Sequence, residues 1–465
     1  MARSLYGGPE EYIMNHYRYR KLGDGYLLTN DYGAWAHVTA DEFKQIKQHK
    51  LGNHAHGILK EKGLVLDHEN VERVIREYRQ KMGYLFQGVS LHIVVPTLRC
   101  NIRCVYCHAK AQSANAKGYD MDEMTAKKTL DFIFQSPSSA YNIEFQGGEP
   151  LLRPDLVKFM INYGHELNKK HKKNLKFSVV TNMTLMTDDM FEFLKKRKVG
   201  LCTSLDGCKA VHNKNRQEYD KVAGWIRKIT KTTTLHAMLL ATKYTLPKYK
   251  EIVDEYIELG LPRIWIKPVN KLAYAQGNWE KIGMTAEEYL KFWRRVIDYI
   301  VLRNRDVFIG EEYTRILLRK ILTKECINFT DLESPCGAAI VQLAYSYDGS
   351  IYTCDEGRLY DIFKLGTVDD RYSDIVTSES ACAIVKASIN DNPVCEVCAY
   401  KPYCGLCPVC SFADTGNIIS KLPDRRCRIL IGMFDYIFEK LLFDDEYKKV
   451  FLSWLPMEKY IKEKT

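Results

Sequence analysis

Three closely spaced cysteines, Cys100, Cys104 and Cys107, could wrap one metal group from a single loop. A cubane [4Fe–4S] cluster needs four ligands, and thiolate is its usual protein ligand. This loop offers three, so one iron would stay open to something that is not a cysteine of the loop. His108 could be proposed as the fourth ligand, although its ring would have to turn back from the adjacent position. The alternative is structural zinc, whose closed tetrahedral site has a different ligand count.

The chain around these cysteines alternates strand-like and helical patterns. Short runs rich in β-branched and aromatic residues are separated by amphipathic stretches with helical spacing. Six β–α alternations predict right-handed crossovers and a parallel sheet in the α/β class, a partial (β/α)6 barrel similar to a TIM barrel. The predicted strands cover residues 90–96, 142–146, 176–181, 201–205, 235–241 and 263–267.

Residues able to bind or react follow directly after four of these strands. The three cysteines follow the first strand, and polar or glycine residues follow the next three. In parallel sheets of this kind, chemistry gathers at the carboxyl ends of the strands. We therefore expect an active-site mouth that includes Gln146, Gly147, Gly148, Glu149, Thr181, Asn182, Ser204 and Asp206.

The spacing of the three cysteines resembles the signature of the radical S-adenosylmethionine (SAM) superfamily. Tyr106 precedes the last cysteine, and the Gly-Gly-Glu-Pro segment at 147–150 follows the next strand, as in that superfamily. The resemblance implies that the open iron chelates the amino and carboxylate groups of SAM. One electron from the cluster would then cleave the sulfonium and yield a 5′-deoxyadenosyl radical, which abstracts hydrogen from the substrate.

The same resemblance implies SAM contacts at the strand ends. Gly147 and Gly148 would let the backbone approach the ligand, and Glu149 would accept a hydrogen bond from the SAM ammonium. The segment 204–207, with His212 and Arg216 after it, is similar to the corresponding stretch of anaerobic sulfatase-maturating enzymes. The implied cofactor-binding residues are Tyr106, Gln146, Gly147, Gly148, Glu149, Thr181, Asn182, Ser204, Asp206 and Arg216.

A second group of cysteines lies toward the end of the chain, and its spacing resembles the SPASM extension of radical SAM enzymes that modify peptides and proteins. That extension holds two auxiliary [4Fe–4S] clusters. The resemblance implies that Cys395, Cys398, Cys404 and Cys427 hold the outer cluster. It implies that Cys336, Cys354 and Cys407 hold the inner cluster, with Cys326 as a candidate fourth ligand.

The inner set departs from the family pattern at one point. Two residues separate Cys404 from Cys407, where the family has three, so Cys410 is an alternative inner ligand. Two zinc ribbons remain the alternative for the whole group, because paired Cys-x2-Cys elements suit zinc as well as iron.

Asp355 directly follows Cys354 and is a candidate catalytic residue. In sulfatase-maturating relatives an aspartate at this place is proposed to take the substrate proton. A carboxylate near a buried cluster could have a raised pKa and serve as a base. The alternative is that Asp355, Glu356 and Arg358 merely pair on a loop.

Residues 1–88 are expected to form a separate small α+β module. Segments 25–29 and 34–38 flank a turn and predict a β-hairpin, Thr39 and Glu42 predict a capping box, and residues 70–82 predict a charged helix. A hairpin followed by helices resembles the leader-peptide recognition domains of peptide maturases, where a precursor adds a strand to the sheet edge. The barrel over 89–320 and a Cys-rich loop and helix domain over 321–465 complete the expected organisation.

Together the resemblances imply a maturase that oxidises or cross-links residues of a ribosomally made peptide or partner protein. Its cofactors would be SAM, the [4Fe–4S] cluster that binds it and two auxiliary [4Fe–4S] clusters, with flavodoxin or ferredoxin as reductant. Segments 26–33 and 354–358 resemble the His-Xaa-Ser-repeat system maturases. The alternatives are a formylglycine-generating, sulfatase-type maturase and, in another class, a zinc-stabilised scaffold protein.

Composition argues against several other classes. Among the 465 residues 46% are hydrophobic, as in a folded globular protein. The longest apolar stretch, 429–443, contains three charged residues and is not expected to span a membrane, and the first residues lack a signal core, which predicts a cytoplasmic protein. The net charge of +10 includes lysine runs at expected helix ends, so we expect no nucleic-acid partner.

Overall fold

A computed structural model describes residues 12–325, 327 and 330–455 of the chain. Its centre is a sheet of ten strands, which lie in the order β14-β13-β12-β11-β10-β9-β6-β15-β16-β17. The strands from β6 to β14 are all parallel to their neighbours. They are β6 (Leu91–Val94), β9 (Ala140–Phe145), β10 (Asn174–Thr181), β11 (Gly200–Ser204), β12 (Leu235–Ala241), β13 (Arg263–Pro268) and β14 (Gly310–Glu311).

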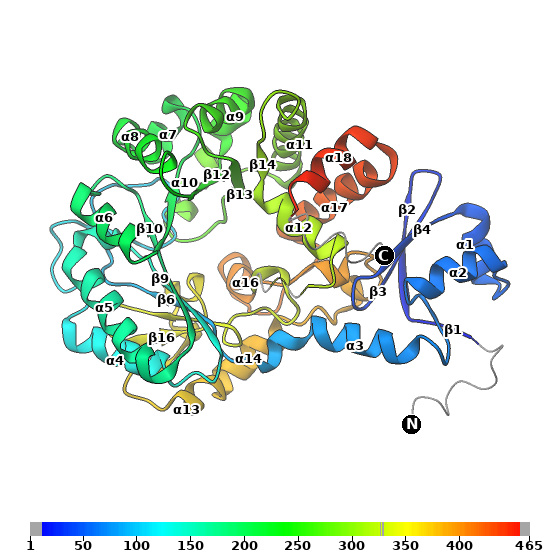
Figure 1. Ribbon diagram of the computed structural model, residues 1–465, viewed down its shortest axis with the longest axis horizontal. Coiled ribbons are helices and arrows are strands. Elements are labelled where there is room, and N and C mark those ends of the chain that lie inside the picture. Colours follow the sequence, from blue (N-terminus) through cyan, green and yellow to red (C-terminus); the bar gives the residue numbers. More distant parts are fainter. Residues whose placement is uncertain (1–11, 326, 328–329, 456–465) are drawn as a thin grey trace.

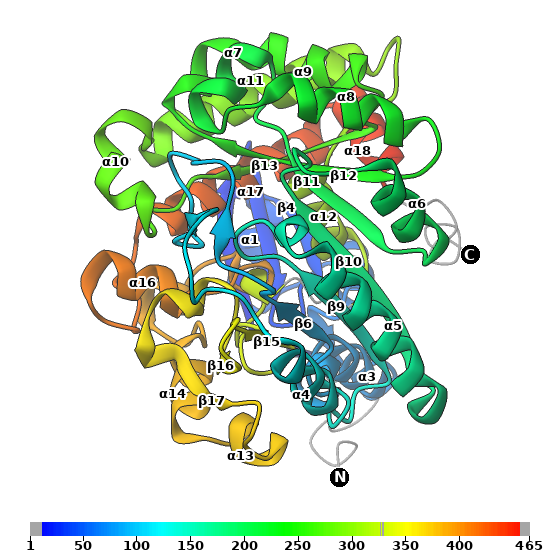
Figure 2. The same cartoon turned by 90° about the vertical axis from the view of Figure 1, so that its left-hand side faces the viewer.

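Helices follow these strands and most of them lie along the outer side of the sheet (Figure 1), whereas α10 (Tyr274–Ile282) packs against residues 104–106. They are α4 (Glu123–Ile133), α5 (Pro154–His171), α6 (Asp188–Lys196), α7 (Lys209–Asn215), α8 (Tyr219–Thr230), α9 (Tyr249–Glu258), α10 (Tyr274–Ile282), α11 (Ala286–Arg303) and α12 (Glu312–Leu322). Figure 2 shows α4 and α5 beside β6, β9 and β10. This arrangement confirms the α/β class, the partial barrel and the six predicted strands; β14 is a short strand that we did not predict.

The Cys-rich part of the chain extends the barrel sheet. Strand β15 (Gln342–Tyr345) pairs in parallel with β6, and β16 (Ser350–Tyr352) and β17 (Lys364–Thr367) continue from it in antiparallel fashion. The first barrel strand is therefore covered on its open edge by a segment from much later in the chain. The remaining helices are α13 (Tyr372–Val376), α14 (Glu379–Ala387), α15 (Pro393–Glu396), α16 (Pro408–Thr415), α17 (Arg425–Phe443) and α18 (Asp445–Ser453).

The N-terminal module, residues 12–88 of the described chain, lies at the opposite end from α4 to α8 (Figure 1). Strands β2 (Tyr17–Leu22), β3 (Gly25–Asn30) and β4 (Trp35–Thr39) form an antiparallel sheet, which confirms the predicted hairpin. Thr39 and Glu42 form the predicted capping box. The other elements are β1 (Ile13–Met14), β5 (Val65–Leu66), α1 (Ala40–Lys47), α2 (Asn53–Glu61) and α3 (Val71–Lys81).

The module is packed into the rest of the protein and is not merely tethered to it. Leu22 and Leu27 belong to the same buried core as Phe434 and Phe438 of α17. A second, smaller core around Leu28 and Leu59 lies within the module. No helix of the described residues is long and apolar enough to cross a membrane.

Candidate active site

The first cysteine loop, residues 99–113, begins and ends in a short parallel pair. β7 (Arg99–Cys100) lies beside β8 (Gln112–Ser113) and closes the loop at its base. Arg99 holds this base: its Nε and Nη2 donate to Asp120 at 2.7 Å each, and Nη1 donates to the carbonyl of Ala114 at 2.6 Å. The bidentate pair is the geometry that suits guanidinium and carboxylate best. The loop that carries Cys100, Cys104 and Cys107 is thus anchored at both ends.

The glycine turn after β9 packs directly on this base. The amide of Gly148 donates to the carbonyl of Thr97 at 2.9 Å, and the amide of Glu149 donates to the carbonyl of Arg99 at 2.8 Å. A Cβ at Gly148 would lie 2.1 Å from the Arg99 oxygen, and one at Gly147 would lie 2.4 Å from a methyl group of Val95. These glycines therefore let the turn approach the cysteine loop, and their predicted approach to SAM stays a prediction.

The Glu149 carboxylate faces the protein interior, and its predicted hydrogen bond to the SAM ammonium stays a prediction. The side chain is fully buried and accepts from the Thr181 hydroxyl at 2.7 Å, the Asn182 amide at 2.8 Å and the Leu151 amide at 3.0 Å. Burial raises the pKa of Glu149, and these hydrogen bonds offset part of that rise. The carboxylate joins the ends of β9 and β10 and does not line the cavity described below.

Asp206, which follows β11, connects the cysteine loop to β12. Its buried carboxylate accepts from the Tyr106 hydroxyl, from Arg216 Nε at 3.3 Å and from the Leu240 amide at 3.2 Å. Arg216 lies 5.0 Å from the centre of the Tyr106 ring, and its Nη1 lies 3.7 Å from Cys104 Sγ. Asp206 is therefore a support for Tyr106 and Arg216, and it too does not line the cavity.

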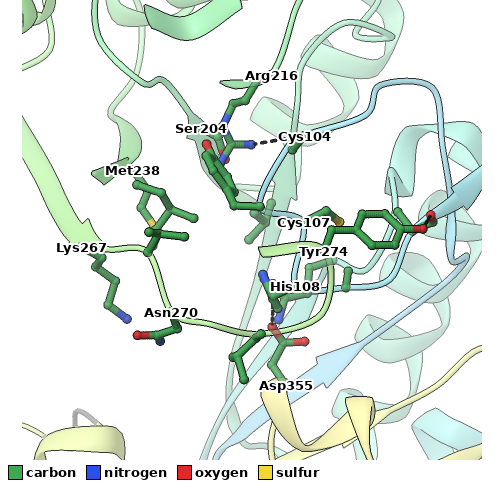
Figure 3. A pocket seen from close by; sticks show the side chains of 18 of the residues that line it. Cys104, Cys107, His108, Ser204, Arg216, Met238, Lys267, Asn270, Tyr274 and Asp355 are labelled. Carbon is green, nitrogen blue, oxygen red and sulfur yellow. Dashed lines mark hydrogen bonds and ion pairs between the residues drawn. The ribbon is translucent and has the colours of Figure 1, made fainter. Parts of the chain in front are cut away.

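A cavity of about 530 Å³ opens at the carboxyl ends of the barrel strands. Ligand pockets of proteins commonly have volumes of this size. The three thiols of the first cysteine loop and Asp355 line it, and Figure 3 labels Cys104, Cys107 and Asp355 among its lining residues. Of the predicted SAM contacts, those that also line it are Tyr106, Gln146, Gly147, Gly148, Thr181, Asn182, Ser204 and Arg216.

The donor set at this cavity fits an iron–sulfur cluster. Burial raises the pKa of the Cys104 thiol to about 12 and that of Cys100 to about 11, so bound iron would have to hold these groups as thiolates. Two N–H donors point at the sulfurs: Arg216 Nη1 at Cys104 and Asn182 Nδ2 at Cys100, each at 3.7 Å. Hydrogen bonds to sulfur are one means by which proteins tune such clusters. Cys100, Cys104 and Cys107 are the residues that would hold it.

His108 and Asp355 face each other across the boundary between the barrel and the Cys-rich part (Figure 3). His108 Nε2 lies 2.8 Å from Asp355 Oδ2, so the ring is directed toward that carboxylate and not back to the cysteine loop. Arg358 contacts the other oxygen of Asp355. Burial would raise the pKa of Asp355, but Arg358 and His108 outweigh it and the pKa is lowered. The expected rise of this pKa is therefore wrong.

Eight of the later cysteines that the structure describes lie in two groups of four, and the exposed Cys382 lies in neither. Cys395, Cys398, Cys404 and Cys427 lie close enough for their thiols to influence one another's ionisation. Cys336, Cys354 and Cys407 share one small core with Phe363 and Val409. The Cys410 amide donates to Cys407 Sγ at 3.5 Å, so Cys410 stands beside this second group. Cys326 lies outside the described residues.

The arrangement of these thiols bears on the zinc alternative. In the part of the chain that the structure describes, no three His, Cys, Asp or Glu side chains converge on a point as ligands of one ion would. In a cubane cluster each thiolate binds a different iron, so its ligands need not converge. Zinc ribbons and iron–sulfur clusters remain the two alternatives for these thiols.

The cavity also contains residues that the motifs did not reveal. Three of them line the wall beside the motif residues: Glu144 of β9, Lys267 of β13, and Asn270, which follows β13. Glu144 accepts from the Ser178 hydroxyl at 3.0 Å, and burial raises its pKa. A carboxylate between the apolar residues Ile143 and Phe145 was the signal for Glu144 in the sequence.

Comparisons with known proteins agree with this site. Residues 94–266 match the Radical SAM superfamily model. A cysteine-type anaerobic sulfatase-maturating enzyme of Clostridium perfringens is 24% identical over 370 residues, which cover 76% of this chain and 97% of that protein. A structure of native anSMEcpe with bound AdoMet has a TM-score of 0.66 at 19% identity, covering 77% of this chain and all of the other. Streptococcus suis SuiB bound to precursor peptide SuiA has a TM-score of 0.55 at 16% identity, covering 88% and 98%.

The chain therefore contains a radical SAM domain over residues 94–266, which includes the first cysteine loop and most of the barrel strands. This identification confirms the predicted superfamily and the predicted enzyme class. A [4Fe–4S] cluster and SAM are the cofactors that the superfamily implies, and the cavity has the thiols and the volume to hold them.

Proposed function

We propose that this enzyme is a maturase that oxidises or cross-links residues of a ribosomally made peptide or a partner protein. One observation carries the proposal. The three thiols of the radical SAM domain line the same cavity as Asp355 and Glu356 of the Cys-rich part. When bound, SAM and its cluster would supply radical chemistry that removes hydrogen from substrate. The Cys-rich part would then place its own groups against the same substrate atom. The similarity to a sulfatase-maturating enzyme and to the SuiB fold supports a polypeptide substrate.

The two later thiol groups support the auxiliary clusters. Each group supplies up to four thiols, the number that a cubane cluster takes from protein. The outer cluster would use Cys395, Cys398, Cys404 and Cys427, and the inner cluster would use Cys336, Cys354 and Cys407. Such clusters would offer an electron exit or a substrate anchor, with flavodoxin or ferredoxin as the external reductant.

The N-terminal module is our candidate for peptide recognition. Among the described residues, β2 and β4 each have one backbone neighbour, β3, so each presents a free edge to an added strand. Beside β2, Tyr19 and Tyr26 pack on Phe43, and Lys47 lies 4.5 Å from the Tyr19 ring. An extended segment with apolar and acidic side chains fits this aromatic and basic surface.

The experiment that tests the whole proposal is the iron and acid-labile sulfide content of anaerobically reconstituted protein, followed by incubation with SAM and dithionite. About twelve irons per chain are expected for three cubane clusters, together with release of 5′-deoxyadenosine. Four to eight irons would retain the radical SAM site and contradict one or both auxiliary clusters. Zinc without iron would overturn the proposal and leave a metal-stabilised scaffold.

Asp355→Asn tests the catalytic role of that carboxylate, which lines the cavity and which we propose takes the substrate proton. The substitution keeps the size of the side chain and removes its charge. We expect product formation to fall about 100-fold or more, the scale for a lost proton-transfer group, while SAM cleavage persists. The readouts are the mass of a co-expressed candidate precursor peptide and the amount of 5′-deoxyadenosine measured by chromatography.

Asp361→Asn is the matched control for this prediction, because Asp361 is an exposed aspartate in the same part of the chain and does not line the cavity. It should form product as the wild type does. Unchanged product formation by Asp355→Asn would show that Asp355 only pairs with His108 and Arg358.

A sulfatase-type maturase is the second candidate, favoured by the similarity that covers 97% of the sulfatase-maturating relative. In that case the product would be formylglycine, made by oxidising a cysteine or serine side chain. Aldehyde-specific labelling of the co-expressed peptide distinguishes formylglycine from a cross-link, because a bond between two side chains leaves no aldehyde.

A further inference from the structure

The N-terminal module is bonded to the loop that carries three outer thiols. Arg18 of β2 reaches that loop with a side chain that is only 3% exposed. Its Nε donates to the Glu396 carbonyl at 2.8 Å and its Nη2 donates to the Glu396 carboxylate at 3.0 Å. Its Nη1 binds Asp31 of the module at 2.6 Å. Glu396 lies between Cys395 and Cys398, so one buried guanidinium holds this segment against the module.

Two further bonds join the module to the same outer cysteine loop, residues 395–404. The Thr29 hydroxyl donates to the Ala399 carbonyl at 2.6 Å, and the Tyr403 hydroxyl donates to the Gly33 carbonyl at 2.9 Å. Ala399 follows Cys398 and Tyr403 precedes Cys404 in the chain. Each outer thiol of this loop therefore has a direct neighbour that is bonded to the module.

The fourth outer thiol is reached through α17. Arg20 of β2 makes a bidentate pair with Asp435 of α17, with Nη2 to Oδ2 at 2.7 Å. The Tyr400 hydroxyl of the outer cysteine loop donates to the same carboxylate at 2.6 Å. Cys427 lies in the first turn of α17. The module, the loop and the helix that carries Cys427 are thus joined through one strand.

β2 presents different residues on its two faces, as a pleated strand must. Arg18 and Arg20 point to the outer cysteine loop and α17, while Tyr17 and Tyr19 lie near Lys47 of α1. Its outer edge has no strand beside it among the described residues. A segment that adds to this edge would order the backbone from which Arg18 reaches the loop.

We propose that β2 couples the edge of the N-terminal sheet to the outer iron–sulfur site, with Arg18 as the positioning residue that joins them. The proposal rests on the proposed occupancy of the outer thiols by a cluster. Coupling between two sites is reciprocal: loading the outer site orders β2, and ordering β2 tightens the outer site. The partner that would use this link is an extended peptide segment with acidic side chains, because the exposed side chains of Lys21 and Lys47 flank the edge.

The first test uses Arg18→Gln in the full, anaerobically reconstituted chain. We expect the electron paramagnetic resonance signal of one reduced auxiliary cluster to change, and about four of the irons to pass to a chelator 10- to 100-fold faster, the range for lost supporting contacts at metal sites. Arg73→Gln is the matched control, because the Arg73 guanidinium binds carbonyls of Lys60 and Glu61 inside the module and does not touch the outer loop. Arg18→Lys should restore the signal only partly, because lysine cannot make the forked contact to Glu396.

The second test removes the outer cluster and measures the effect on β2. In Cys398→Ser, which should lose the outer cluster, amide hydrogen exchange over residues 17–22 is expected to speed up by about tenfold or more as local opening becomes easier. Exchange over α8, far from the outer site in the barrel, should not change. The coupling is refuted if Arg18→Gln has the wild-type electron paramagnetic resonance signal and the wild-type rate of iron release. It is also refuted if amide hydrogen exchange of β2 is the same in Cys398→Ser as in the wild type. If the wild type binds zinc and no iron, the proposed function fails. The coupling is then tested by comparing amide hydrogen exchange of β2 in metal-loaded and metal-stripped protein.

Discussion

Cys104→Ala is expected to abolish SAM cleavage while the barrel stays folded. Formation of 5′-deoxyadenosine should drop by at least about 1000-fold, as when an essential catalytic group is lost. Cys104 lines the cavity and is the thiol to which Arg216 donates, so its removal leaves two thiols and a guanidinium without its sulfur partner. The measurement is chromatography of anaerobic reactions with SAM and dithionite, together with iron content.

The fold should survive this change because the cysteine loop is anchored by other residues. Arg99 binds Asp120 at its base, and Asp206 holds Tyr106 and Arg216 without any contribution from the thiol. Circular dichroism and the thermal midpoint of the apo-protein should match those of the wild type. Cys208→Ala is the control, since Cys208 belongs to the same domain and does not line the cavity. SAM cleavage by Cys104→Ala at the wild-type rate would overturn the assignment of the cluster site.

The strand ends could be predicted from the sequence because they depend on local patterns. A run of apolar residues followed by cysteines or by a Gly-Gly turn places those residues at the carboxyl edge of a parallel sheet. That reasoning says nothing about which way a carboxylate points. Glu149 turns inward because Thr181 and the amide of Asn182, from another strand, offer it hydrogen bonds. Asp206 is held in the same way by Tyr106 and Arg216.

Pairings between distant segments were also beyond prediction. β15 adds to β6 although some 250 residues separate them, and its four residues have no distinctive period. Asp355 shows the same limit: Arg358, three residues later, could be foreseen as a partner, but His108 comes from another domain. These two cations together lower a pKa that burial alone would raise. The direction of such a pKa shift cannot be predicted from the sequence, because it depends on charged groups that only the fold brings together.

Gly148→Ala should cost about 3 kcal/mol or more of stability, beyond the usual range for one added methyl group in a packed core. The new Cβ would lie 2.1 Å from the Arg99 oxygen and 2.6 Å from carbon atoms of Leu98 and Arg99. All three atoms belong to backbone, which cannot rotate away as a side chain would. The expected readouts are a lower thermal midpoint and poor iron retention.

Gly224→Ala is the control for Gly148→Ala, because Gly224 lies inside α8 and its Cβ would meet nothing within 4 Å. That substitution should stabilise the protein by about 0.5–1 kcal/mol through helix propensity. If Gly148→Ala lowers the free energy of unfolding and Gly224→Ala raises it, the loss of stability comes from the close approach of the turn to the cysteine loop. A Gly148→Ala protein as stable as the wild type would mean that the turn can retreat from Thr97 and Arg99. The hydrogen bonds of Gly148 and Glu149 would then not be what positions the loop, and the anchor would rest on Arg99 and Asp120 alone.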